Sequence, residues 1–121
     1  MGLIIADTNI IIYAIKGLKE IEPYISEYNF TVSEITIIEL PGVKDIDPFT
    51  LNKRKELLAD CHIYNYNSYI RSLAIGIKQT HIIKVPDALI AATAIHYDTP
   101  MLTADKGFKK IEELEVIIID L

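Results

Sequence analysis

Short apolar runs recur along this chain of 121 residues, and they constrain its fold more than any other feature. A strand with one face in water alternates apolar and polar side chains, whereas a strand covered on both faces is apolar along its length. Apolar strands are predicted at 3–6, 30–32, 101–103 and 115–119, with a weaker one at 62–64. We therefore expect a mostly parallel sheet covered by helices on both faces.

Helical segments separate these strands, and cap and stop residues mark their ends. Asp7 and Ser33 stand where side chains cap helices, Gly17 stands at a helix end, and Pro48 and Pro86 stand at helix starts. The predicted helices cover about 8–16, 18–28, 34–40, 49–60, 68–80, 85–97 and 106–114. Because no linker or repeat interrupts this order, we expect residues 1–121 to form one three-layer α/β/α domain.

Composition narrows the classes of function. Half of the residues are hydrophobic and the net charge is −5, which argues against a protein that holds nucleic acid by general basic charge. The single cysteine, Cys61, excludes an intramolecular disulfide and fits a reducing compartment. No apolar run approaches the roughly 20 residues that span a bilayer, and the start does not resemble a signal peptide. We expect a cytoplasmic protein without a membrane anchor.

Four acidic residues stand at the edges of apolar runs, where a carboxylate adds nothing to a core. Asp7 and Asp105 follow predicted strands, whereas Glu39 and Asp87 lie on predicted helices. The carboxyl ends of parallel strands share one edge of a sheet, and ligand sites form there. Carboxylate oxygens are the ligands that hard cations prefer. If the four side chains converge, they predict a metal-dependent enzyme.

Each acid also has an ordinary explanation. Asp7 and Asp105 can cap the helices that follow them, and Asp87 can favour the dipole of its helix. Glu39 can be a solvated helix residue. Taken singly, each acid favours that explanation, but the four together favour a site.

Four sequence segments carry a family resemblance. They are Ile5-Ala6-Asp7-Thr8-Asn9, Thr36-Ile37-Ile38-Glu39-Leu40, Pro86-Asp87-Ala88-Leu89-Ile90-Ala91-Ala92-Thr93-Ala94 and Leu102-Thr103-Ala104-Asp105-Lys106-Gly107-Phe108. In their order and spacing they resemble the four motifs of the PIN-domain family. Within that family the chain is most similar to the short VapC type, the ribonuclease toxins of toxin–antitoxin pairs. The resemblance covers essentially the whole chain.

The resemblance implies a site for Mg²⁺ or Mn²⁺ and no organic cofactor. Asp7 is then the best direct ligand, and Asp87 and Asp105 bind directly or through water. Glu39 orients a water molecule or binds a second cation. All four acids are predicted to be catalytic.

The resemblance also implies a supporting set of hydroxyl and amide groups. These contact the ligands or a substrate phosphate, and the residues are Thr8, Asn9 and Thr103. Many family members have a further aspartate where this chain has Gly107. Asp105 is therefore expected to stand alone at its corner of the site.

The resemblance further implies three partners: an RNA substrate, a cognate antitoxin and a second copy in a homodimer. A nuclease of RNA maturation or quality control is the alternative within the family. A phospho-receiver domain is the alternative of another class, and the sequence disfavours it. Asp7 has no acidic neighbour, and no lysine follows the last strand.

Other polar and aromatic residues have weaker functional signals. The histidines have no ligand spacing, and they are His62, His81 and His96. Packing or a protein interface is the expected use of Tyr64, Tyr66 and Tyr69, although they could stack bases. The basic residues expected nearest to a substrate phosphate are Lys16, Arg71, Lys84, Lys106 and Lys109.

Overall fold

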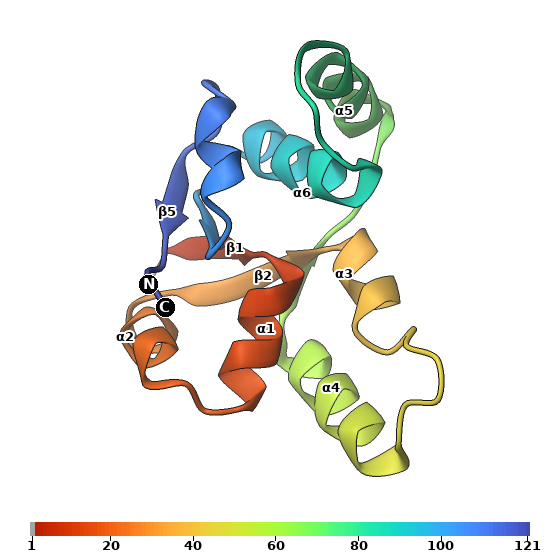
Figure 1. Cartoon of the computed structure of the whole chain (residues 1–121), viewed down its shortest axis with the longest axis vertical. Helices are drawn as coiled ribbons and strands as arrows, with labels where there is room; N and C mark the ends of the chain where they lie inside the picture. The colour runs from red at the N-terminus through yellow and green to blue at the C-terminus, as the bar shows by residue number, and fades with distance from the viewer. Residues whose placement is uncertain (1) are drawn as a thin grey trace.

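The computed structural model describes residues 2–121, and a sheet of five parallel strands divides the molecule (Figure 1). The strands are β1 (Leu3–Ala6), β2 (Asn29–Ser33), β3 (His62–Tyr64), β4 (Met101–Thr103) and β5 (Val116–Ile118). Their order across the sheet is β3-β2-β1-β4-β5. This arrangement confirms the predicted α/β fold, and every strand pair is parallel.

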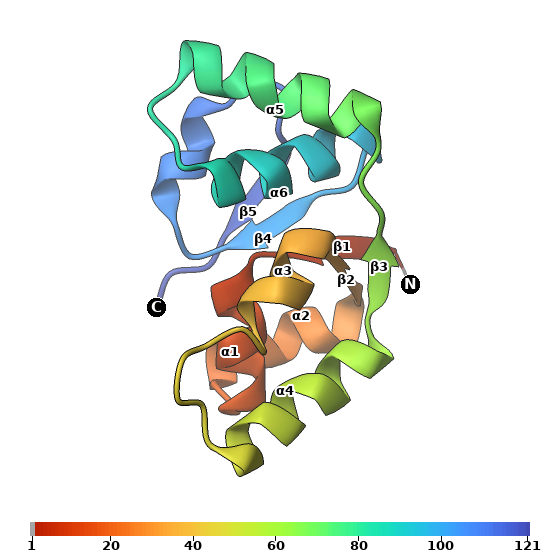
Figure 2. The same ribbon diagram turned by 90° about the vertical axis from the view of Figure 1, so that its right-hand side faces the viewer.

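Helices cover the sheet on both sides, as Figures 1 and 2 show. The α-helices are α1 (Thr8–Ile15), α2 (Glu22–Glu27), α3 (Glu34–Glu39), α4 (Pro48–Asp60), α5 (Ser68–Thr80) and α6 (Val85–His96). The other helical elements among the described residues are two short 3₁₀ helices, η1 (Lys19–Ile21) and η2 (Lys106–Lys110). Helices α5 and α6 lie on one side of the sheet, and α1, α2 and α4 lie on the other.

The alternation of side chains along β1 separates two apolar cores. Successive strand residues point to opposite faces, so Ile5 packs with α5 and α6 while Ile4 and Ala6 pack with α1. In β4, Met101 joins the first core and Leu102 joins the second. These side chains are wholly buried, which explains why the strands read as apolar on both faces.

Two predicted helices are shorter in the structure. The segment 18–28 begins with the η1 turn, because Pro23 lacks the N–H group that would bond to Lys19 in a continuous α-helix. The segment 106–114 contains only the η2 turn. Its buried residues Phe108, Ile111 and Leu114 recur every three positions, a period that suits 3₁₀ geometry rather than α-helical geometry.

The short helix α3 is held at its beginning by side chains from outside it. The backbone N–H of Ile35 donates to the hydroxyls of Ser33 and Tyr66, each at 3.2 Å. The Glu34 carboxylate accepts a hydrogen bond from the backbone N–H of Tyr66. Six residues form a weak helix by themselves, so these contacts set the position of α3.

The end of α3 is fixed as well. Arg54 of α4 donates from its guanidinium to the carbonyl oxygen of Leu40 at 2.8 Å. A Cβ atom at Gly42 would lie 2.3 Å from the carbonyl oxygen of Ile38, so the chain can leave the helix here only with glycine. Glu39 is therefore presented from a helix whose two ends are both anchored.

The carboxyl ends of β1 and β4 are neighbours at the centre of the sheet. The backbone N–H of Asp7 donates to the carbonyl oxygen of Leu102 at 3.0 Å, which extends the ladder beyond β1. Chain connections leave in opposite directions on the two sides of this strand pair. Such a switch point is where open parallel sheets form their sites.

Candidate active site

Asp7 is the most buried acid, with 9% of its surface exposed. It caps α1, and its Oδ1 accepts a hydrogen bond from the Thr8 N–H at 2.8 Å. Its Oδ2 accepts a hydrogen bond from the Thr103 hydroxyl at 2.8 Å. Capping and site formation are therefore compatible, because one carboxylate is oriented by both α1 and β4.

Asp105 follows β4, and Thr103 links it to Asp7 by hydrogen bonds. Its backbone N–H donates to the Thr103 hydroxyl oxygen at 3.0 Å, while its Oδ1 accepts from the Gly107 N–H at 2.8 Å. A Cβ atom at Gly107 would lie 3.0 Å from that Oδ1. The glycine thus leaves room for Asp105 to cap η2, and Asp105 is the acid of this corner.

Glu39 reaches the start of α1 through hydroxyl groups. The Thr8 hydroxyl donates to Glu39 Oε1 at 2.7 Å. The same Thr8 hydroxyl lies 2.9 Å from the hydroxyl of Thr36, which is wholly buried in α3. Thr36 was not among the residues predicted from the sequence, although its place one turn before Glu39 on the same face of α3 is a signal that could have found it.

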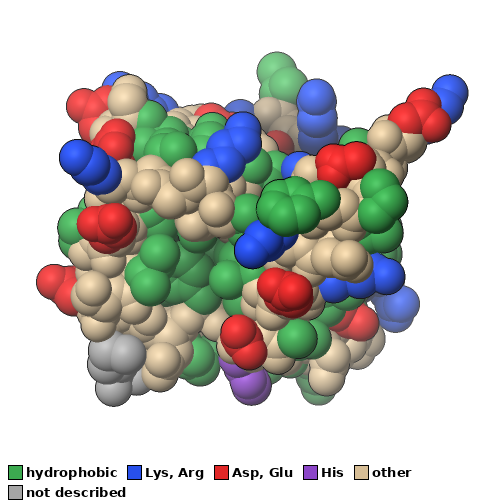
Figure 3. All heavy atoms as spheres, turned by 90° about the horizontal axis from the view of Figure 1, so that it is seen from below, with side chains coloured by type: hydrophobic (Ala, Val, Ile, Leu, Met, Phe, Trp, Pro, Cys, Tyr) green, Lys and Arg blue, Asp and Glu red, His purple; other side chains and the backbone are tan. Residues whose placement is uncertain are grey.

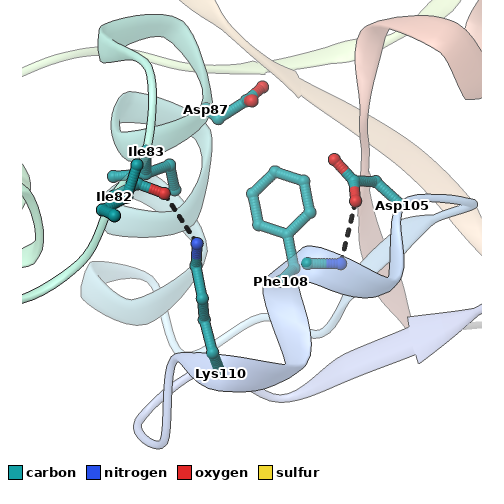
Figure 4. A pocket seen from close by; sticks show the side chains of 7 residues that line it. Ile82, Ile83, Asp87, Asp105, Phe108 and Lys110 are labelled. Carbon is teal, nitrogen blue, oxygen red and sulfur yellow. Dashed lines mark hydrogen bonds between the residues drawn. The ribbon is translucent and has the colours of Figure 1, made fainter.

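Asp87 stands in the first turn of α6 and faces Asp105 across a small cavity. The cavity has a volume of about 90 Å³ and is lined by Ile82, Ile83, Asp87, Asp105, Gly107, Phe108 and Lys110. Figure 4 shows both carboxylates turned toward the same space, with the Phe108 ring between them. Lys110 does not reach the acids, because its Nζ donates to the carbonyl oxygen of Ile82 at 2.6 Å.

The pKa values of Asp7 and Asp87 are raised, first by burial and then by the charges of neighbouring acids. Burial raises the pKa of Asp7 above its ordinary value; the hydrogen bond from Thr103 lowers it, and the charges of Asp87 and Asp105 raise it further. Burial also raises the pKa of Asp87, and the charges of Asp105 and Glu39 add to the increase. Lys84 acts in the opposite direction on Asp87. Negative charge is thus concentrated at this edge of the sheet.

The donor set suits a hydrated hard cation. Among residues 2–121, no three His, Cys, Asp or Glu side chains lie together closely enough to enclose a metal ion as they stand. A tight cage of the kind that a dehydrated ion needs is therefore not preformed. Mg²⁺ keeps several of its waters and usually binds one or two carboxylates directly. The four carboxylates repel one another and all their donor atoms are oxygen, which fits that mode of binding.

The remaining predicted residues lie in the site, in the core or at the surface. Thr8 and Thr103 bond to the acids, whereas Asn9 is exposed and has no such bond among the described residues. Tyr64 is buried and stacks on Tyr97 with ring centroids 4.0 Å apart. The three histidines have separate contacts: His62 with Tyr64, His96 with Tyr69, and His81 with Lys110.

Strand order separates this fold from the phospho-receiver alternative. Receiver domains have the order 2-1-3-4-5, whereas here β1 lies between β2 and β4 and the order is 3-2-1-4-5. Asp7 and Asp105 consequently meet across β1 and β4, which are central neighbours. In a receiver sheet these two strands are not adjacent.

Comparisons with known proteins find similar chains and similar folds. Ribonuclease VapC of Rickettsia bellii (strain RML369-C) is 34% identical over 140 residues, covering 100% of this chain and 98% of the relative. VapBC2 from Rickettsia felis, solved bound to a DNA fragment from its promoter, matches with a TM-score of 0.82 and 26% identity over 99% of this chain and 100% of that chain.

A second solved structure supports the fold alone. DNA-bound VapBC from Salmonella typhimurium matches with a TM-score of 0.86 over 98% of both chains, at 19% identity. The PIN domain family model matches residues 4–114, which span all four acids. The chain therefore belongs to the PIN domain family.

Proposed function

We propose that this protein is an endoribonuclease that hydrolyses RNA phosphodiesters with Mg²⁺ or Mn²⁺ and acts as the toxin of a toxin–antitoxin pair. The observation that carries the proposal is the gathering of Asp7, Glu39, Asp87 and Asp105 at the carboxyl edge of the sheet. The full-length similarity to a protein named Ribonuclease VapC supports RNA as the substrate.

The four acids have different supports and therefore different roles. Asp7 is buried and held by two hydrogen bonds, so it would be the fixed ligand for the cation. Asp87 and Asp105 face each other across the cavity and would reach the cation directly or through water. Glu39 accepts a hydrogen bond from Thr8 and would orient a metal-bound water or bind a second cation. A bound divalent cation would offset the repulsion among the acids, lower the pKa of a water and stabilise charge on the phosphodiester.

An antitoxin partner is supported by the solved relatives and by one exposed surface. Two solved relatives that are each 26% identical carry this support: VapBC2 from Rickettsia felis, and a structure from Klebsiella pneumoniae that is described as a toxin–antitoxin complex. On this chain, a surface between α1 and α4 is lined by Ile12, Ile15, Lys16, Phe49, Thr50, Lys53 and Arg54. Figure 3, which views the α4 end, shows hydrophobic side chains gathered there with basic ones beside them. Such a surface suits a partner segment with apolar and acidic side chains.

We also propose a cytoplasmic protein. Among the described residues, no helix is long and apolar enough to cross a bilayer. The single cysteine, Cys61, is free and fits a reducing compartment.

Removing an acid of the site should abolish RNA cleavage. Asp7→Asn and Asp87→Asn each remove one negative charge while keeping the side-chain shape, so we expect at least a ~100-fold lower rate with Mg²⁺, as fits the several kcal/mol that a metal contributes. Asp60→Asn, at an exposed position at the end of α4, is the matched control and should cleave like the wild type. The measurement is cleavage of a mixed RNA substrate, with a chelator and a single-stranded DNA of the same sequence as comparisons. Equal rates for all four proteins would contradict the proposal.

The acids should also make the cation-free protein less stable at neutral pH. The pKa values of Asp7 and Asp87 are raised in the folded state. The contribution of these two residues to the free energy of unfolding is therefore greatest below about pH 4, which is near the pKa of aspartate in the unfolded chain. This contribution is lost as the pH rises through the folded-state pKa. At pH 7.5 we expect Asp7→Asn to melt roughly 3–6 °C higher, which corresponds to about 1 kcal/mol in a chain of this size. Near pH 4 the difference should vanish.

The same melting experiment tests the cation. Millimolar Mn²⁺ should raise the melting temperature of the wild type, because a ligand that binds only the folded state stabilises it, and should leave Asp7→Asn nearly unchanged. A variant that melts below the wild type at pH 7.5, or a wild type indifferent to Mn²⁺, would refute this account of the site.

Growth of a bacterial host distinguishes a toxin from a nuclease of RNA maturation. Induction of the wild type should arrest growth, induction of Asp7→Asn should not, and co-expression of the small protein encoded beside the gene should restore growth. Phe49, which is 73% exposed between α1 and α4, allows a more specific test of antitoxin binding at this surface. Phe49→Asp should remain toxic but escape the antitoxin. Unaffected growth on wild-type induction would favour the RNA-maturation alternative.

We propose a homodimer formed through an apolar groove between α5 and α6. The groove has a volume of about 410 Å³ and is lined by Arg71, Ala74, Ile75, Lys78, Gln79, Val85, Ala88 and Leu89. Ile75 and Val85 are 53% and 57% exposed, and a second copy would cover both. Sedimentation at micromolar concentration should show a dimer for the wild type and a monomer for Ile75→Asp. A monomeric wild type would contradict the proposal.

A further inference from the structure

Thr36 has a buried hydroxyl group that forms its hydrogen bond outside its own helix. A threonine inside a helix usually donates to the carbonyl oxygen four residues earlier, as Thr93 does to Leu89 at 2.7 Å. For Thr36 that residue is Val32, which belongs to β2, because α3 begins only at Glu34. The side chain is wholly buried, so its hydroxyl needs another partner. That partner is the Thr8 hydroxyl, 2.9 Å away.

Counting protons gives this contact a direction. Each threonine hydroxyl has one proton to donate, and an ionised carboxylate can only accept. The Thr8 proton is used in the 2.7 Å bond to Glu39 Oε1. The proton between the two threonines must therefore come from Thr36. The result is a chain of donors that runs from Thr36 to Thr8 to Glu39.

This chain links the two elements that carry half of the site. Thr8 begins α1 directly after Asp7, and Glu39 ends α3 one turn beyond Thr36. A hydroxyl that accepts one hydrogen bond while donating another is held in one rotamer, and each bond strengthens the next. Without the Thr36 hydroxyl, Thr8 keeps its carboxylate acceptor but loses the donor that orients it.

We propose that Thr36 is a positioning residue that holds the Thr8 hydroxyl, and through it the Glu39 carboxylate, in the geometry required for the reaction. The inference rests on the proposed metal-dependent cleavage for its effect on rate, but the orientation of Thr8 is a property of the cation-free protein. Thr36 itself does not contact the substrate or the cation.

Variants at position 36 separate the hydroxyl from the packing. Thr36→Val keeps the shape and removes the hydroxyl, and Thr36→Ser keeps the hydroxyl and removes the methyl group. Thr36→Ala and Thr36→Ser differ only in the hydroxyl, so this pair serves if the valine variant does not fold. Thr93→Val removes an equally buried hydroxyl from α6 and is the matched control.

The first measurement is the χ1 rotamer of Thr8 in the cation-free protein, from three-bond couplings to its methyl carbon. A single rotamer is expected in the wild type, Thr36→Ser and Thr93→Val, and an average over rotamers in Thr36→Val and Thr36→Ala. A single Thr8 rotamer in every variant would overturn the proposal. This result does not depend on any nuclease activity.

The second measurement is binding of Mn²⁺ by calorimetry, together with RNA cleavage as a function of Mn²⁺ concentration. Thr36→Val should raise the half-saturating Mn²⁺ concentration roughly tenfold, the size expected for losing one hydrogen bond in a chain that ends on a charge. Thr36→Ser should restore it to within about threefold, and Thr93→Val should match the wild type. In a Glu39→Gln background, Thr36→Val should have no further effect.

The outcomes for the two proposals are distinct. A wild type that neither binds Mn²⁺ nor cleaves RNA refutes the proposed function, while the Thr8 rotamer still decides whether Thr36 orients it. A wild type that is active, with Thr36→Val equal to it in Mn²⁺ dependence, refutes the positioning role alone. A full effect of Thr36→Val in the Glu39→Gln background refutes it as well.

Discussion

The parallel pairing of β1 with β4 is the contact on which the site depends. These strands are separated by about four-fifths of the chain, and their pairing places the residues that follow them side by side. The Thr103 hydroxyl then completes the contact, donating to Asp7 and accepting from the backbone of Asp105. One buried side chain on β4 thus fixes the relation between two acids from opposite ends of the sequence.

The arrangement concentrates negative charge where water is partly excluded. Burial and mutual repulsion raise the pKa of Asp7 and Asp87, and hydrogen bonds from Thr103 and Thr8 only partly offset this at Asp7. A protein keeps such a cluster at the expense of stability, and strained or repelling groups are typical of functional sites. The favourable contacts that hold the acids in place come from the two apolar cores beneath them.

Local sequence patterns predicted most of the fold. The apolar strands, the caps at Asp7 and Ser33 and the prolines at helix starts act within a few residues, so they are legible without the tertiary structure. The segment 106–114 was misread because its three-residue apolar spacing resembles one face of a helix. There, burial of Phe108 and Leu114 overrides helix propensity.

Only part of the candidate site could be predicted from the sequence. The acids stood out because a carboxylate at the end of an apolar run needs an explanation. Thr36 did not stand out, because a threonine in an apolar helix is ordinary, and its importance arises only when α3 packs beside the start of α1. Nor could the sequence indicate that Lys110 is bound to the Ile82 carbonyl oxygen rather than to an acid. Long-range contacts of this kind are set by packing and not by local pattern.

The two separate cores have a mechanical consequence. Helix α1, which begins at Thr8, packs with Ile4 and Leu102, whereas α6, which carries Asp87, packs with Ile5 and Met101. Helix α3, which carries Glu39, contributes Ile37 to the first of these cores and Ile35 to the second. The four acids therefore come from elements that pack on both faces of the sheet. A divalent cation bound among them would therefore link the two helical layers directly, in addition to the sheet on which both layers pack.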